Sequence, residues 1–275
     1  MRYGGNDRER QTPVALVPCS ASSARQWSAL AAELGERFRP VFVGLRGHGR
    51  CGPWHGAGAL TLAEEGKAIS AALAGHDAPF HLVGHSYGGG VALRFALDHP
   101  TRLRSLTLIE PSCFHLLKEA GDEASLLDEV LALAETISYA AICGDYRAGM
   151  AEFIDYWSGA GSWAGLSEEK RTQFAGLAVH VAHHFHSLIE EPTPLAAYGA
   201  ITVPTLVLCG NRSPRPSRAI ARLVTGALPN ARHLTIAGGN HMSPLLRPND
   251  VNPLILQHLE ANTVYVEPRR TGTHD

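Results

Sequence analysis

One serine stands in a pattern that is typical of a catalytic nucleophile. The segment Gly84-His85-Ser86-Tyr87-Gly88 follows an apolar run at 80–83 and precedes a segment of helical period. Between a strand and a helix, Gly-x-Ser-x-Gly forms a sharp, strained turn in which side chains at 84 and 88 would collide. The turn holds the hydroxyl at a helix N-terminus, where the dipole favours developing negative charge. Ser86 is therefore the candidate nucleophile, and a glycine-rich packing turn is the alternative.

Apolar periodicity predicts the elements that must position this turn. Short apolar runs bounded by turn residues predict buried strands at 14–17, 41–43, 80–83, 106–109, 205–209 and 233–236. Segments of helical period lie between several of them, at 26–37, 62–74, 91–99, 218–227 and 251–259. Because strands and helices alternate, the predicted fold class is α/β, with a mostly parallel sheet flanked by helices.

One interval interrupts the alternation. Residues 111–203 contain helical patterns but no convincing strand. We therefore expect residues 111–202 to form an inserted helical cap, with 13–110 and 203–262 forming one core, since strands on either side of an insertion can still pair. The termini, 1–12 and 263–275, are predicted to be flexible.

Further motifs accompany the serine. Leu45-Arg-Gly-His-Gly49 follows the second strand run, Trp27 follows the first, and Gly238-Gly-Asn-His241 comes near the end. With Gly-x-Ser-x-Gly, these make most of the chain resemble the α/β-hydrolase family. The resemblance implies a triad in the order Ser, acid, His. It also implies that His241, on the loop after the last strand, takes the serine proton and returns it to the leaving group.

The acid departs from the pattern of most relatives, which carry an Asp after the strand that corresponds to 205–209. Ser213 stands where that Asp is expected, and no Asp or Glu occurs from Pro192 to Asn249. Glu110 directly follows the preceding strand, 106–109, and some family members, including certain haloalkane dehalogenases, are similar in placing the acid there. We predict Glu110 as the acid. The alternative is that Asn211 or a backbone carbonyl orients His241.

The resemblance also suggests the residues around the reacting carbonyl. Acyl transfer needs two N–H donors for the oxyanion. The backbone N–H of Tyr87 is one, and alignment on Trp27 places the other at Ser20, where relatives read His-Gly but this chain reads Pro18-Cys19. Cys19 lacks the flanking glycines of a nucleophile. The predicted substrate-binding residues are Cys19, His85, Phe153, Tyr156, Trp157 and Trp163, although the aromatic ones are equally well explained as the core of the cap.

Two clusters of charged or titratable residues have ordinary explanations. His180, His183, His184 and His186 share one helical stretch, but no carboxylate pair or third ligand accompanies them, so no metal site is predicted. The only charged residues from Pro192 to Asn249 are arginines, which we interpret as a solvated face. An anionic substrate near Arg212 and Arg215 is the alternative.

Composition sets the broad class. The chain has 275 residues, 45% of them hydrophobic and 18% charged, with a net charge of -2, which is typical of a soluble globular protein. Neither nucleic acid nor a membrane surface is an expected partner, because no basic footprint is present. Five cysteines without a Cys-x-x-Cys pair predict no disulfide framework. The polar N-terminus and the lack of a membrane-spanning segment predict a cytoplasmic protein.

These observations predict a serine hydrolase that cleaves a carboxylic ester or lactone of a small molecule through an acyl-enzyme. No cofactor is expected, because no Gly-x-Gly-x-x-Gly follows any predicted strand. Alternatives on the same triad are a carbon–carbon bond hydrolase and a cofactor-free haloperoxidase-like enzyme. A non-catalytic ligand-binding protein of this fold is the alternative from a different class. The oligomeric state is left open.

Overall fold

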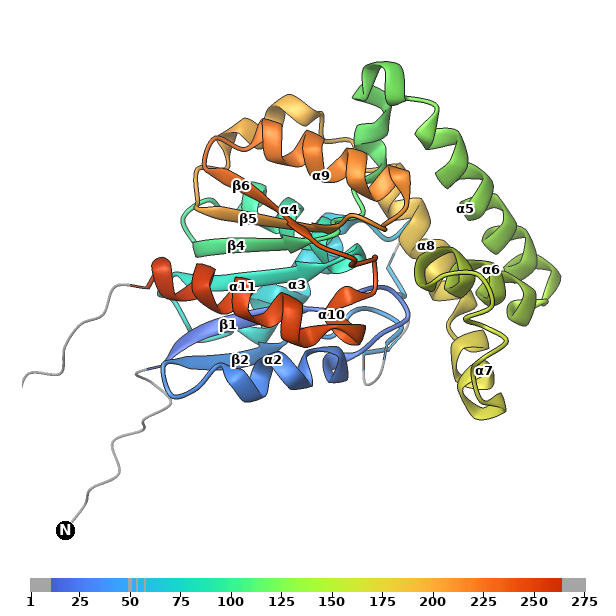
Figure 1. The fold of residues 1–275 in the computed structure, drawn as a ribbon, viewed down its shortest axis with the longest axis horizontal. Coiled ribbons are helices and arrows are strands. Elements are labelled where there is room, and N and C mark those ends of the chain that lie inside the picture. Colours follow the sequence, from blue (N-terminus) through green and yellow to red (C-terminus); the bar gives the residue numbers. More distant parts are fainter. Residues whose placement is uncertain (1–10, 49–50, 53, 57, 264–275) are drawn as a thin grey trace, which may run out of the picture.

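The computed structural model describes residues 11–48, 51–52, 54–56 and 58–263. Its centre is a sheet of six strands in the order β2-β1-β3-β4-β5-β6, with every pairing parallel (Figure 1). This arrangement confirms the predicted fold class. The strands are β1 (Thr12–Val17), β2 (Phe38–Phe42), β3 (Phe80–His85), β4 (Leu103–Ile109), β5 (Thr205–Gly210) and β6 (Ala231–Ile236).

Helices cover both faces of the sheet because side chains alternate along each strand. Val14 and Leu16 of β1 pack into the core beneath α2 (Ser28–Glu33) and α11 (Pro248–Ala261). Ala15 and Val17 belong to the opposite and larger core. That core lies beneath α3 (Leu62–Ala72), α4 (Tyr87–Asp98) and α9 (Arg215–Ala227). The central strands β1, β3, β4 and β5 are therefore buried on both sides, as the continuous apolar runs predict, whereas the edge strands β2 and β6 are partly exposed.

The chain between β4 and β5 is helical. It contains the short 3-10 helices η2 (Phe114–Glu119), η3 (Gly121–Glu123) and η4 (Leu195–Ala200). It also contains α5 (Leu126–Cys143), α6 (Tyr146–Ser158), α7 (Glu168–Ala175) and α8 (Ala178–Ile189). We call α5–α8 the cap helices. They gather beside one end of the sheet in Figure 1. A 3-10 helix, η1 (Ala24–Trp27), and the short α10 (Ser243–Leu246) complete the fold.

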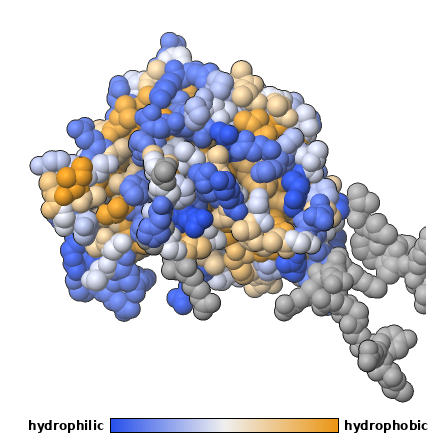
Figure 2. All heavy atoms as spheres, turned by 180° about the vertical axis from the view of Figure 1, so that it is seen from behind, coloured by the Kyte–Doolittle hydropathy of each residue, from blue (hydrophilic) through white to orange (hydrophobic). Residues whose placement is uncertain are grey.

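The surface is mixed in character. Seen from behind, hydrophilic and hydrophobic residues alternate, and hydrophobic side chains are visible at the end where the cap helices lie (Figure 2). Ile142 at the end of α5 is 84% exposed. None of the helices in the described ranges is both long and apolar enough for a bilayer crossing.

Strand register brings distant residues to one edge of the sheet. His85 is paired with Ile109, and Ile109 is paired with Leu208. Ser86 and Glu110, which follow the first two of these residues, therefore leave the sheet side by side at the carboxyl ends of β3 and β4. Strand β5 continues beside them to Gly210. In parallel α/β sheets, ligands bind at this edge.

Candidate active site

Ser86 occupies a strained turn between β3 and α4. Its backbone has φ 55° and ψ −118°, a conformation that L residues rarely adopt. Close packing explains the two glycines of the motif. A Cβ atom at Gly84 would lie 2.3 Å from the Gly88 carbonyl oxygen, and one at Gly88 would lie 2.4 Å from the carbonyl oxygen of Pro18. The surrounding backbone thus holds the serine in position before any substrate arrives.

The serine hydroxyl meets an imidazole. His241 Nε2 lies 2.9 Å from Ser86 Oγ, and both side chains are buried. Ser112 Oγ lies 3.2 Å from the same hydroxyl oxygen. Because the single proton of the Ser86 hydroxyl is directed at Nε2, the Ser112 hydroxyl is the donor in the second contact. This geometry allows His241 to take the proton when Ser86 attacks a carbonyl.

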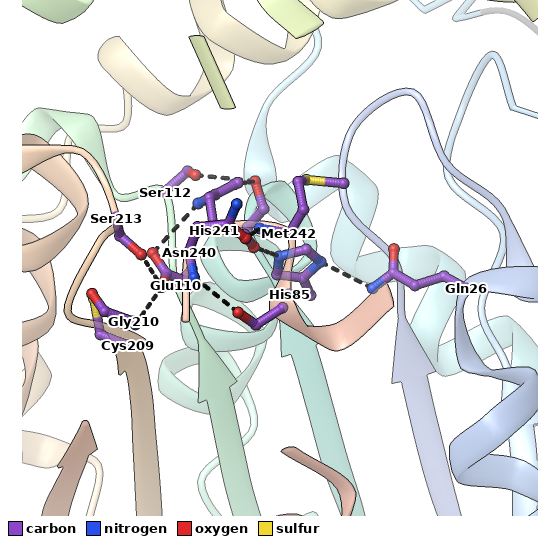
Figure 3. A network of polar contacts seen from close by, with 12 residues as sticks. Gln26, His85, Glu110, Ser112, Cys209, Gly210, Ser213, Asn240, His241 and Met242 are labelled. Atoms are coloured by element: carbon purple, nitrogen blue, oxygen red, sulfur yellow. Dashed lines mark hydrogen bonds and ion pairs between the residues drawn. The ribbon is translucent and has the colours of Figure 1, made fainter. Parts of the chain in front are cut away.

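Glu110 completes a chain of three side chains. Its Oε2 lies 3.4 Å from His241 Nδ1, a long contact of the kind that tightens when substrate binds. Its Oε1 accepts hydrogen bonds from the Gly210 N–H at 2.6 Å and the Ser213 hydroxyl at 2.5 Å (Figure 3). The Glu110 side chain is 0% exposed. Glu110 is therefore not a solvated loop residue, and Ser213, at the position of the usual acid, holds its carboxylate.

Asn211 lies elsewhere. Its side-chain oxygen accepts a hydrogen bond from the Gly238 N–H at 2.8 Å, at the start of the loop that carries His241. The backbone carbonyl of His241 itself accepts a hydrogen bond from His85 Nε2 at 2.8 Å (Figure 3). Glu110 is thus the group that faces the His241 Nδ1 atom.

His85 was expected to bind substrate, but its ring is buried and is not among the side chains that line the pocket. Its ring is 0% exposed, Nε2 donates to the His241 carbonyl, and Nδ1 accepts from the Gln26 amide at 2.9 Å. Burial lowers the pKa of His85 to about 3, so the ring stays neutral and both hydrogen bonds persist at any pH well above 3. His85 fixes the backbone of the loop that carries the base.

Two residues of the site, Ser20 and Tyr87, have backbone N–H groups that bond to no acceptor among the described residues. Tyr87 is the first residue of α4, so its N–H has no partner inside the helix. Ser20 lines the same pocket as Ser86, and its N–H has no acceptor among the described residues. Both are the donors that the sequence predicts. Their pairing with an oxyanion stays a prediction.

His184 of α8 touches both of these residues through their side chains. Its Nδ1 lies 2.8 Å from Ser20 Oγ, and its ring stacks on that of Tyr87 with centroids 3.8 Å apart. It also stacks on His48, at 5.0 Å. Of the four histidines of α8, His184 therefore packs against the site, whereas His183 and His186 are exposed. Within the described ranges, His, Cys, Asp and Glu side chains form no group of three that could hold a metal ion.

A pocket of about 350 Å³ opens over Ser86 and His241. Cys19 and the predicted cap aromatics Phe153 and Trp157 line it, and the Trp157 ring lies 4.1 Å from the His241 ring. Burial raises the pKa of the Cys19 thiol to about 12, so this cysteine stays a thiol and not a nucleophilic thiolate.

Two expected lining residues lie outside the pocket. The Tyr156 hydroxyl donates to Glu129 of α5, and Trp163 is held by its backbone N–H, which donates to Asp155. Both belong to the packing of the cap helices. Tyr156 contacts α5 instead of the pocket, whereas Phe153, Ile154 and Trp157 of the same helix line the wall.

The sequence analysis did not identify most of the apolar residues that line the pocket. The missed residues come from α6, α7, α10 and the segments beside them: Ile154, Leu166, Phe174, Met242, Leu245 and Leu246. The Leu245-Leu246 pair in the short α10, just after the catalytic loop, is the one signal that the sequence offers. Arg212 and Arg215 are not among the lining residues.

A buried carboxylate supports the adjacent loop and has a testable pH dependence. Glu65 of α3 is 0% exposed, and its carboxylate accepts the Arg46 N–H at 3.1 Å. Burial raises its pKa from 4.5 to about 7. Between these values the folded protein keeps a proton that the unfolded chain releases, so stability falls as pH rises through this window.

We expect Glu65→Gln to remove this pH dependence. The free energy of unfolding of the wild type should fall by up to about 3 kcal/mol between pH 4.5 and 7.5 because of this one group. Denaturant melts at several pH values measure it. Glu64→Gln, a change at a more exposed residue of the same helix, is the control and should keep the wild-type slope. Equal slopes for all three proteins would contradict the prediction.

Comparison with known proteins agrees with this geometry. The model of the alpha/beta hydrolase family matches residues 14–254, and the chain belongs to this family. It is 35% identical over 113 residues to N-formylmaleamate deformylase of Pseudomonas putida, covering 40% of each protein. It is 34% identical over 113 residues to lipase LipV of Mycobacterium tuberculosis, again covering 40% of each. These matches span about two fifths of either relative.

A solved structure extends the similarity of the fold. MGS-M2, an alpha/beta hydrolase enzyme from a Medee basin deep-sea metagenome library, superposes with a TM-score of 0.72 at 17% identity. The match covers 94% of this chain and 92% of that one. At this identity the similarity concerns the fold alone.

Proposed function

We propose that the protein is a serine hydrolase that cleaves carboxylic esters with a neutral, apolar acyl group. The proposal depends most on one observation, the 2.9 Å contact between Ser86 Oγ and His241 Nε2 at the floor of a pocket. The curated relatives support hydrolysis, since both are named for hydrolytic activities, a deformylase and a lipase.

The chemistry follows from the side chains. Ser86 Oγ attacks the ester carbonyl carbon while its proton passes to His241 Nε2, and the N–H groups of Ser20 and Tyr87 receive the oxyanion. The C–O bond then breaks, and the alcohol leaves with the proton from His241. Water repeats the sequence on the acyl-enzyme and releases the acid. Glu110 keeps the Nδ1 proton of His241 in place and stabilises the imidazolium.

The pocket supports the neutral acyl class. The apolar part of its wall consists of leucine, isoleucine, phenylalanine, tryptophan and methionine side chains, five serines also line it, and no Asp, Glu, Lys or Arg of the described ranges does. A charged acyl group would lose its water there without gaining a partner of opposite charge. The volume of about 350 Å³ is at the small end for ligand pockets, which favours short or medium acyl groups.

Two measurements test the proposal. A fluorophosphonate probe should label the wild type at Ser86, as peptide mass spectrometry would detect. The kcat/KM for p-nitrophenyl pentanoate should exceed that for mono-p-nitrophenyl glutarate, which has the same chain length and a terminal carboxylate, by about 10-fold or more. Well-folded protein without labelling or ester turnover would reject the enzyme and favour a binding protein. Preference for lactones or diketones in the same screen would reject the ester class.

A further inference from the structure

The Ser20 N–H lies between two peptide groups that side chains hold in place. On one side, the N–H of Cys19 donates to Gln26 Oε1 at 3.0 Å. The Gln26 amide nitrogen donates in turn to His85 Nδ1 at 2.9 Å, and this contact fixes which end of the amide faces Cys19. Gln26 is only 8% exposed, so water competes little for these bonds.

On the other side, His48 holds the next peptide. Its Nε2 accepts the N–H of Ala21 at 2.9 Å. Its Nδ1 lies 2.9 Å from the Arg46 carbonyl oxygen, which only accepts, so Nδ1 carries the proton and Nε2 is free to accept. Burial lowers the pKa of His48, which keeps the ring in this neutral form.

The backbone at this point needs such support. Ala21 has φ 55°, one of three described non-glycine residues with positive φ, and the other two are Ser86 and Glu110. A non-glycine residue in this region costs about 1 kcal/mol or more and persists only where its surroundings impose it. The His48 contact with the Ala21 N–H is a specific interaction that favours this conformation.

We propose that Gln26 and His48 are positioning residues of the oxyanion hole. By fixing the peptide groups before and after it, they aim the Ser20 N–H at the carbonyl that Ser86 attacks. They do so where this chain carries Pro18-Cys19 and its relatives commonly carry His-Gly. The inference rests on the proposed function, because it assigns a purpose to a donor of that same site.

The inference predicts that His48 variants lose stabilisation only of those states in which the bound carbonyl has become an oxyanion. Removing an oxyanion donor altogether costs about 100- to 1,000-fold in kcat. Loosening one by His48→Leu should lower kcat for p-nitrophenyl pentanoate by about 10- to 100-fold, with KM changed less than about 3-fold. His48→Gln, whose amide oxygen can replace Nε2 as acceptor, should retain most of the activity. His48 is the cleaner test, because Gln26 also touches His85.

Inhibitor binding separates positioning from general structural damage. The probes are 1,1,1-trifluoro-2-hexanone, which adds to Ser86 as an oxyanion, and 1,1,1-trifluoro-2-hexanol, which cannot. His48→Leu should lower the affinity for the ketone by the same factor as it lowers kcat, and should leave the affinity for the alcohol unchanged. Thermal unfolding checks that both variants are folded.

The outcomes are distinct. Unchanged kcat and ketone affinity in His48→Leu, or equal weakening of ketone and alcohol, would overturn the positioning role while leaving the hydrolase proposal intact. A wild type that binds the ketone no more tightly than the alcohol and turns over no ester would instead defeat the proposed function, and the inference with it.

Discussion

Ser86→Ala is expected to lower kcat for ester hydrolysis by about 10⁵-fold or more, because losing the nucleophile of a triad removes almost the whole covalent route. The residual rate would come from the oxyanion donors and substrate binding alone. Ester turnover, measured with p-nitrophenyl pentanoate, and fluorophosphonate labelling should be lost together. The stability of the fold should be unaffected, because alanine has the same steric cost as serine in this positive-φ backbone conformation.

The neighbouring hydroxyl provides the comparison. Ser112 Oγ is 3.2 Å from Ser86 Oγ but makes no hydrogen bond to His241 within the described residues. Ser112→Ala should therefore cost far less than Ser86→Ala. If Ser112→Ala abolished labelling while Ser86→Ala kept it, the assignment of the nucleophile would be wrong.

Glu110→Gln should lower kcat by about 1,000- to 10,000-fold with little change in KM. The glutamine oxygen would accept from Gly210 and Ser213 as the carboxylate does now, which turns its NH₂ group toward His241 Nδ1. The imidazole would then carry its proton on Nε2, the wrong atom for accepting one from Ser86. Steady-state kinetics at a fixed pH measures the effect.

Asn211→Ala is the matched comparison, because Asn211 is the competing candidate for orienting the base. Its amide oxygen contacts the Gly238 N–H, so the variant should stay within about 3-fold of the wild-type kcat. A larger loss in Asn211→Ala than in Glu110→Gln would show that the acid has been assigned to the wrong residue.

The fold could be predicted from sequence because its signals are local. Apolar runs such as 205–209 fall inside β5, and turn residues bound them. Helix starts were less accurate: α4 begins at Tyr87, four residues before the first apolar residue of the pattern. Three glycines at 88–90 have no side chains, so the first turn of the helix shows no apolar periodicity. Neighbouring backbone packs too closely at Gly88 to admit a side chain.

The grouping of Ser86, Glu110 and His241 could also be predicted from the sequence, since Ser86 and Glu110 follow neighbouring strands and His241 follows the last one. The pocket could not. Whether Trp157 or Tyr156 faces the pocket depends on how α6 packs against α5, α7 and α8, and no residue spacing gives that. The burial of His85 between Gln26 and the His241 carbonyl joins three distant segments, and such a contact leaves no trace in local periodicity.

The hydrogen bond between Ser213 and Glu110 bears on how such sites diverge. It shows that side chains following β4 and β5 reach one another, so we expect an acid at position 213 to reach the same imidazole. A lineage passing through a form with acids at both positions would keep a working base throughout. Movement of the acid from one strand to the other would then require no simultaneous changes.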